Sequence, residues 1–241
     1  MSSTFLRPLA LWLGYDLRTV RRSDSIDLNL KRYFAHHETG LVVDCGAHHG
    51  GFAKMARGAG YQGPILSFEP ASANFAVLNE VSRGDSLWRV RHAGLGAANG
   101  QLSLNINAGS NFHSLLASNS TMTARFPALR TTSTEAVGIL RLDDALAGET
   151  IAHDVPIFLK TDTQGHDLAV LEGAGARLSQ IAAIMIEMPV QPIYEGAPDH
   201  WRIMATLRDA GYELYATSTV SRDASGGLIE YDAIWRRVAR S

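Results

Sequence analysis

Cysteine is nearly absent from this 241-residue chain. Cys45 is the only one, so the sequence excludes an internal disulfide and any cysteine-rich zinc site. Because Cys45 stands in an apolar run, we expect a small, buried thiol. A reduced thiol of this kind is typical of a cytoplasmic protein, and we predict that location.

Long apolar runs are also missing. The longest near the N-terminus, Leu9 to Leu13, is far shorter than the roughly 20 residues of a membrane-spanning helix. It has neither a basic lead-in nor a small-residue cleavage site, so it does not resemble a signal peptide. We predict a short helix packed on the domain, with weak contact to a membrane surface as the alternative.

Charge of one sign is not in excess. The 22 basic and 24 acidic residues leave a formal net charge of −2. Such a balance gives no long-range field for nucleic acid or an anionic membrane, so we expect no nucleic-acid partner. Lys31, Lys54 and Lys160 are the only lysines. The tightest arginine group (Arg18, Arg21 and Arg22) indicates a solvated surface rather than a phosphate site.

Apolar residues are plentiful. They form 46% of the chain, which is enough for one sizeable core, and the length suits a single α/β domain. Residues 1–38 are predicted to form a helical extension, and residues 39–241 the main domain.

Short apolar runs alternate with helix-like segments. Strands are predicted near residues 41–45, 65–68, 88–92, 156–160, 181–185, 212–217 and 228–235, and helices near 52–57, 70–81, 167–178 and 201–210. Residues 101–107 alternate between apolar and polar, which predicts a half-buried strand, and residues 135–142 return to a strand-like alternation. This alternation predicts a doubly wound, mostly parallel sheet with helices on both faces.

An acidic residue closes each of four apolar runs, namely Asp44, Glu69, Asp162 and Glu187. Doubly wound sheets bind ligands beyond the carboxyl ends of their strands. A carboxylate there is rigidly held and faces the crevice, so these four residues together predict a functional site.

The first of these acids opens a glycine turn, Asp44-Cys-Gly46-Ala-His-His-Gly50. Gly46 and Gly50 permit positive φ and the close approach of a ligand. Glu69 follows Gly46 by 23 residues, at the end of the next predicted strand. A carboxylate in that place can accept hydrogen bonds from both hydroxyls of a ribose.

The glycine spacing separates two candidate cofactors. A dinucleotide turn needs Gly-x-Gly-x-x-Gly so that pyrophosphate reaches the helix N-terminus. Here Ala47, His48 and His49 interrupt that pattern, and Asp44 would repel pyrophosphate but suit a cationic methionine ammonium. S-adenosylmethionine is therefore favoured over NAD. A nicotinamide-dependent oxidoreductase is disfavoured by this spacing, and also because the sequence lacks the catalytic lysine pattern of a dehydrogenase.

Five motifs together resemble the FkbM-type methyltransferases, over roughly residues 41–235. They are Val43–Gly50, Ser67–Pro70, Arg141–Asp144, Leu159–Asp167 and Gly173-Ala174. His48 stands where relatives often have Asn, and Gln164 where many have Glu.

The resemblance implies a seven-stranded, Rossmann-like class I methyltransferase sheet with an antiparallel terminal strand inserted at one edge. It makes residues 39–241 the methyltransferase domain. Relatives O-methylate sugar hydroxyls of glycolipids, oligosaccharides and polysaccharides, or hydroxyls of polyketides. The cofactor-binding residues expected from motif and resemblance are Asp44, Gly46, Ala47, His48, Gly50, Glu69, Pro70 and Asp162.

Methyl transfer to a hydroxyl is an in-line displacement that needs alignment, exclusion of water and a proton acceptor. Asp162 is the first candidate for that acceptor, and its alternative roles are a helix cap or a cofactor contact. His166 could be the base instead, or could hold the acceptor. Glu187 could position the acceptor hydroxyl or make a structural hydrogen bond.

Residues 107–130 are rich in Ser, Thr, Asn and Gly, which is typical of a functional or mobile loop. We predict a mobile lid there, with little apolar surface to hold it down. Asn111, His113 and Ser114 of this segment, with Gln164, are the predicted acceptor-binding residues. The loop from Met188 to His200 is the other expected source of specificity.

A divalent metal could bind Asp162, Glu187 and His166, but no compact spacing requires one, so no metal is assigned. The expected function is S-adenosylmethionine-dependent O-methylation of a sugar hydroxyl, with a small molecule or glycan as partner. Alternatives are a polyketide or other small-molecule hydroxyl, and a catalytically silent cofactor-binding scaffold. The oligomeric state is not predicted.

Overall fold

The computed structural model describes residues 10, 12–14, 25–149 and 154–238. The arginine group at residues 18–22, and the apolar positions Leu9 and Leu11, lie outside the described residues. So does most of the predicted N-terminal extension. Its described part contains helix α2 (Ile26–His36), which packs on the sheet through Leu30 and Tyr33. The division into an extension and a methyltransferase domain stays a prediction.

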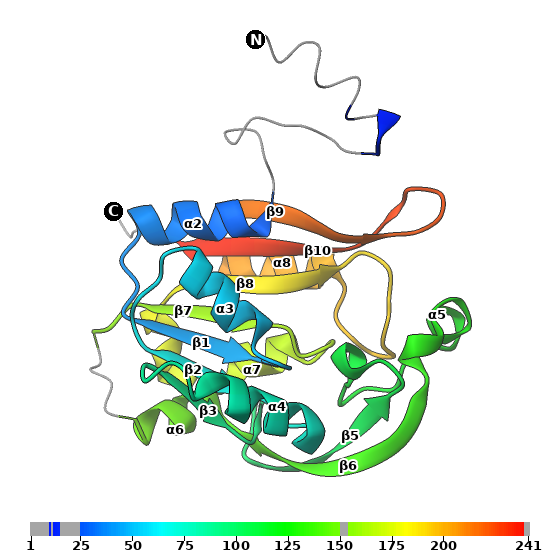
Figure 1. The fold of residues 1–241 in the computed structure, drawn as a ribbon, viewed down its shortest axis with the longest axis horizontal. Helices are drawn as coiled ribbons and strands as arrows, with labels where there is room; N and C mark the ends of the chain where they lie inside the picture. Colours follow the sequence, from blue (N-terminus) through cyan, green and yellow to red (C-terminus); the bar gives the residue numbers. More distant parts are fainter. Residues whose placement is uncertain (1–9, 11, 15–24, 150–153, 239–241) are drawn as a thin grey trace.

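A seven-stranded sheet in the order β3-β2-β1-β7-β8-β10-β9 forms the centre of the molecule (Figure 1). Its strands are β1 (Leu41–Cys45), β2 (Ile65–Phe68), β3 (Trp88–Arg91), β7 (Ile157–Thr161), β8 (Ile181–Pro189), β9 (Tyr212–Arg222) and β10 (Leu228–Arg237). β1, β2, β3, β7 and β8 run parallel, whereas β10 is antiparallel to both β8 and β9. The predicted doubly wound sheet with an inserted antiparallel strand is confirmed.

Helices cover both faces of this sheet, so its central strands are buried throughout. Neighbouring residues of one strand enter opposite cores: Val42 and Phe158 face one side, Val43 and Leu159 the other. The first core is closed by α2, α3 (Gly51–Gly58) and α4 (Ser72–Ser82). The second is closed by α6 (Leu142–Ala147), α7 (Asp167–Gly173) and α8 (His200–Asp209). The continuous apolar runs of β1 and β7 follow from this two-sided burial.

A second, three-stranded sheet lies beside the first, and its formation as a separate sheet was not predicted. It consists of β4 (Gly94–Leu95), β6 (Thr131–Leu140) and β5 (Gly100–Asn107), in that order. The strand-like patterns in the sequence fall on β5 and β6, which pair antiparallel. Leu104, Val137 and Ile139 pack with Ala71 in a small apolar cluster, which fixes this sheet against the end of β2.

The polar segment between β5 and β6 is not the loose loop that its composition indicated. It contains η2 (Ser110–Phe112), α5 (Ser120–Arg125) and η3 (Pro127–Leu129). Met122 and Leu129 are buried against Ile193, Tyr194 and Ile229. The expectation that little apolar surface holds this segment is therefore wrong, because its partners lie far away in the sequence.

Among the described helices, none is both long and apolar enough to cross a membrane.

Candidate functional site

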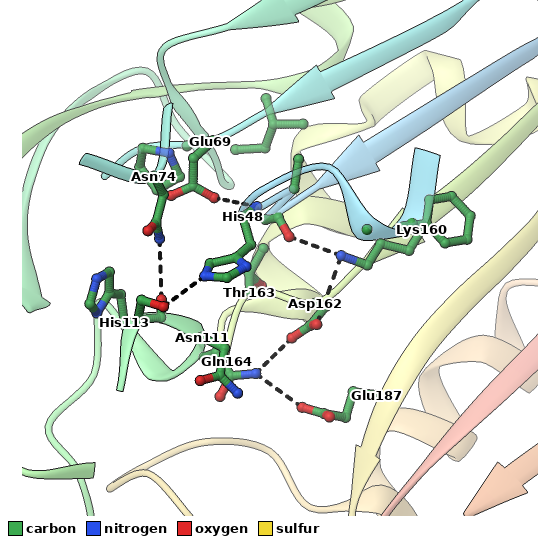
Figure 2. Close-up of a pocket in the computed structure, with 18 of the residues that line it drawn as sticks. His48, Glu69, Asn74, Asn111, His113, Lys160, Asp162, Thr163, Gln164 and Glu187 are labelled. Carbon is green, nitrogen blue, oxygen red and sulfur yellow. Dashed lines mark hydrogen bonds and ion pairs between the residues drawn. The ribbon is translucent and has the colours of Figure 1, made fainter. Parts of the chain in front are cut away.

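A cavity of about 390 Å³ opens beyond the carboxyl ends of β1, β2, β7 and β8 (Figure 2). Its volume is within the range of small-molecule sites. Glu69, Asp162 and Glu187, three of the four strand-end acids, line it. Asp44 does not line it, because its side chain is completely buried behind the cavity wall.

The glycine turn after β1 forms one wall. Gly46, His48 and Gly50 have φ of 71°, 50° and 80°, so the left-handed conformations expected of the glycines are present. The atoms that approach Gly46 and Gly50 closely in the structure belong to the protein itself. A Cβ on Gly46 would overlap the backbone oxygen of Asp162, and one on Gly50 would overlap the ring of Trp88. Gly46 and Ala47 line the cavity, whereas Gly50 supports the turn from behind.

Glu69 ends β2 with both carboxylate oxygens held by the backbone. His48 N donates to Oε2 at 2.7 Å, and Ala71 N donates to Oε1 at 3.0 Å. Burial raises the pKa of Glu69, and the two N–H donors oppose that rise. Pro70 lines the cavity beside it but does not open the next helix as expected, since α4 begins at Ser72. Each carboxylate oxygen keeps a second lone pair for a ligand.

Lys160 places a cation of the protein itself beside Asp44, the residue that was predicted to face the methionine ammonium of the cofactor. Its Nζ is 3.2 Å from Asp44 Oδ1 and 3.8 Å from Asp162 Oδ2, and it donates to Gly46 O at 2.9 Å. Burial lowers the pKa of Lys160, but the neighbouring carboxylates outweigh it and raise the pKa above its usual value. Ser67 Oγ donates to the other oxygen of Asp44 at 3.2 Å. Asp44 is thus paired with Lys160 and does not line the cavity, and its role as a cofactor-binding residue stays a prediction.

Gln164 joins the carboxylates on the opposite side of the cavity (Figure 2). Its Nε2 donates to Asp162 Oδ1 at 2.7 Å and to Glu187 Oε2 at 3.1 Å. Tyr194 OH donates to Gln164 Oε1 at 2.6 Å, which fixes the orientation of the amide. Gln164 itself adopts a φ of 54°. Asp162 does not cap the following helix; Asp167 instead holds that turn through Thr161 and Thr163.

The cavity contains an acidic side chain in addition to the predicted Asp162 and Glu187. Asp232 lies opposite Glu187 in the β8–β10 register and also lines the cavity. Burial and the charge of Asp162 raise the pKa of Asp232 to about 7. Burial, together with Asp162 and Glu230, raises the pKa of Glu187 well above its usual value. Glu187 and Asp232 therefore keep their protons at pH values where exposed carboxyl groups, whose pKa is near 4, have lost them.

The segment after β5 covers the cavity. Asn111 and His113 line it, whereas Ser114 is buried and donates from Oγ to Gln164 O at 2.7 Å. Ser110 Oγ is 2.9 Å from His48 Nε2, which connects the segment to the glycine turn. Burial, with the neighbouring imidazoles, lowers the pKa of His48 to about 4, so its ring is neutral.

His166 is not brought to the cavity. It precedes α7, and a Cβ on Gly96 would lie 3.1 Å from its Nε2, so the ring packs on the turn after β4. Burial lowers the pKa of His166. Asp162 is consequently the better placed of the two candidate bases. Within the described part of the chain, no group of three or more His, Cys, Asp or Glu side chains is arranged to hold a metal ion.

Sequence reasoning missed Lys160, Tyr194 and Asp232. A signal existed for Lys160, because a lysine inside a buried strand is seldom found without a partner. Tyr194 stands in the irregular loop after β8, and Asp232 in a strand whose partner could be identified only from the register.

Comparison with known proteins places the chain in a family. The model of the methyltransferase FkbM domain matches residues 44–214. The methyltransferase FkbM from Methylobacillus flagellatus KT is 15% identical with a TM-score of 0.52, over 89% of this chain and 56% of that one. The chain thus spans little more than half the length of that structure.

Two further solved structures resemble the fold more weakly. Magnesium protoporphyrin IX methyltransferase from Synechocystis PCC 6803, solved with bound S-adenosylmethionine, is 8% identical with a TM-score of 0.48, over 98% of this chain and 92% of that one. Precorrin-6y C5,15-methyltransferase from Geobacter metallireducens GS-15 is 9% identical with a TM-score of 0.47, over 92% and 93%. No curated protein matches the sequence. Because the family model spans every predicted site residue from Asp44 to Glu187, this chain belongs to the FkbM methyltransferase domain family.

Proposed function

We propose that the chain is an S-adenosylmethionine-dependent O-methyltransferase acting on a sugar hydroxyl of a glycolipid, oligosaccharide or polysaccharide. The carboxyl groups that line the cavity carry this proposal. They belong to Glu69, Asp162, Glu187 and Asp232, whereas Lys160, the one lysine among the lining residues, is already paired with Asp44. Such a site favours a donor with a sulfonium and an ammonium group and disfavours a pyrophosphate.

The residues of the cavity fit this cofactor. Glu69 offers two oxygens that the backbone holds rigidly, which suits a pair of ribose hydroxyls. Ala47 and His48 of the glycine turn line the adjoining wall, next to Pro70. Asp162 is at the other end, where a cationic group would meet its charge. When bound, S-adenosylmethionine supplies an electrophilic methyl group.

Asp162 is the proposed proton acceptor for the attacking hydroxyl. A carboxylate cannot deprotonate an alcohol beforehand, but it can receive the proton as the oxygen attacks and becomes acidic. Gln164 holds Asp162 Oδ1 in place, and the positive charge of Lys160 is 3.8 Å from Oδ2. Glu187, held by the same amide, is available to orient the acceptor.

The proposal is tested by calorimetry with S-adenosylhomocysteine and NAD, followed by transfer of labelled methyl groups to a panel of glycans. We expect S-adenosylhomocysteine to bind, NAD not to bind, and label to enter a base-stable ether. Label transferred only to polyketide hydroxyls would contradict the acceptor class. Cofactor binding without transfer to any hydroxyl would favour the silent scaffold.

A further inference from the structure

A second cavity, of about 240 Å³, adjoins the first. The two share five lining residues, so the proposed acceptor end of the site belongs to both: Asn111, Asp162, Gln164, Glu187 and Val220. The rest of the second cavity is mainly apolar. Its walls include Phe112, Met122, Phe126, Leu129, Ile193 and Ile229.

These apolar walls belong to three ordered segments of the chain. They come from the segment between β5 and β6, the loop after β8, and β10. Backbone hydrogen bonds join the first two: Asn119 N donates to Ile193 O, and Glu195 N to Ala117 O, both at 2.8 Å. Met122 is 5% exposed, whereas Phe126 at 37% lies toward solvent. The apolar surface therefore continues from the interior to the outside.

The inner end of the second cavity is polar. Glu230 joins Glu187 and Asp162 there, and Ser221 Oγ donates to Glu230 at 3.2 Å. Carboxyl oxygens at this end can accept hydrogen bonds from several hydroxyls of one sugar. Arg222 also lines the cavity, but its guanidinium already donates to Gly226 O at 3.0 Å. The shape and chemistry suit a molecule with a hydroxyl-rich end and an apolar end.

We infer that the second cavity is an acceptor subsite for an apolar group attached to the methylated sugar. The acceptor class is then a glycoside with an apolar aglycone, as in a glycolipid, rather than an unsubstituted polysaccharide. A polymer that is polar along its whole length would leave the walls around Met122 and Phe126 without a complementary partner. The inference rests on the proposed function and narrows its substrate.

The test compares butyl and methyl glycosides of glucose, galactose, mannose and rhamnose by calorimetry on the full chain, after S-adenosylhomocysteine binding has been measured alone. For at least one sugar we expect the butyl glycoside to bind roughly 10- to 50-fold more tightly, the factor for two to three buried methylene groups. Phe126→Ala should reduce that ratio severalfold and leave S-adenosylhomocysteine affinity unchanged. Leu102→Ala is the matched control, because Leu102 is exposed on β5 and lines neither cavity.

Equal affinities within every pair, or no binding of either glycoside, would overturn the inference. An unchanged ratio in Phe126→Ala would also overturn it, because the preference would then arise elsewhere. Failure of S-adenosylhomocysteine to bind would refute the proposed function instead, and the glycoside comparison would still be decided on the free protein.

Discussion

Replacing Lys160 by Met tests whether the buried ion pair with Asp44 holds the site together. Methionine keeps the length of the side chain but removes its charge and its hydrogen bond to Gly46 O. Asp44 would then be fully buried with no cation beside it. Breaking a buried pair by removing one partner costs about 3–5 kcal/mol, because the remaining charge is uncompensated. We expect a loss of that size in the free energy of unfolding.

Urea denaturation of Lys160→Met and of the double variant Asp44→Asn, Lys160→Met provides the measurement. The double variant should recover at least about 1 kcal/mol, since it no longer buries an unpaired charge. S-adenosylhomocysteine affinity of Asp44→Asn separates the two roles considered for Asp44. A loss of affinity without a loss of stability would refute the structural role and restore Asp44 as a direct cofactor contact.

The direction of the pH dependence follows from the raised pKa of Lys160. A lysine that is protonated more readily in the folded state contributes its full stability below its unfolded pKa of about 10.4. That contribution is lost as the pH rises above this value. The stability difference between wild type and Lys160→Met should therefore be constant near neutral pH and shrink in strongly alkaline solution. A difference that grew with pH would contradict the ion pair.

Four further outcomes are expected. Glu69→Ala should weaken S-adenosylhomocysteine binding roughly 30- to 150-fold, the loss of about 2–3 kcal/mol of charge-assisted hydrogen bonding, and unchanged calorimetry in a folded variant would exclude the ribose role. Asp162→Asn should lower the transfer rate by ~10²–10⁴ at nearly constant cofactor affinity, and near-normal turnover would exclude the proton-acceptor role. Tyr194→Phe should lower kcat severalfold with little change in stability beyond about 1 kcal/mol, whereas Tyr212→Phe, which removes a hydroxyl bonded to a distant carbonyl, should leave kcat unaltered. The pKa of Asp232 is raised to about 7, so the folded protein holds this proton at pH values where the unfolded chain has lost it. The free energy of unfolding should therefore fall by up to about 4 kcal/mol between pH 4 and 7. Asp232→Asn should flatten that pH dependence.

The central sheet could be predicted because its signal is local. Val42 and Val43 are both fully buried, and so are Phe158 and Leu159, so each strand appears as a short apolar run. An acid follows or ends the run, and the class of sheet fixes where that acid lies. The strands and the positions of these acids could therefore both be predicted without knowing which distant residues they contact.

The second sheet gave a weaker signal. β5 and β6 each begin with four exposed residues, Gly100 to Ser103 and Thr131 to Thr134, so the alternation covers only part of each strand. The packing of Met122 likewise depends on Ile193 and Ile229, which follow it by 71 and 107 residues. Apolar residues with such distant partners have no periodicity of their own, which is why the covering segment appeared loose.

The neighbours of the strand-end acids could be found only from the register. Asp44 on β1 lies opposite Lys160 on β7, and Asp232 on β10 lies opposite Glu187 on β8. A shift of one residue would turn either side chain to the other face of the sheet. Sequence reasoning located the acids correctly at strand ends but could not determine which charges faced them.

The neutral amide at position 164 is explained by the charges around it. FkbM-type relatives often have Glu there, yet a carboxylate within 2.7 Å of Asp162 and 3.1 Å of Glu187 would force protons onto the group. Gln164 instead donates one N–H to each carboxylate, and its oxygen accepts from Tyr194. Both of its donors are used in this way. We therefore interpret Gln164 chiefly as a positioning residue: its two N–H donors hold the carboxyl groups of Asp162 and Glu187 in fixed positions.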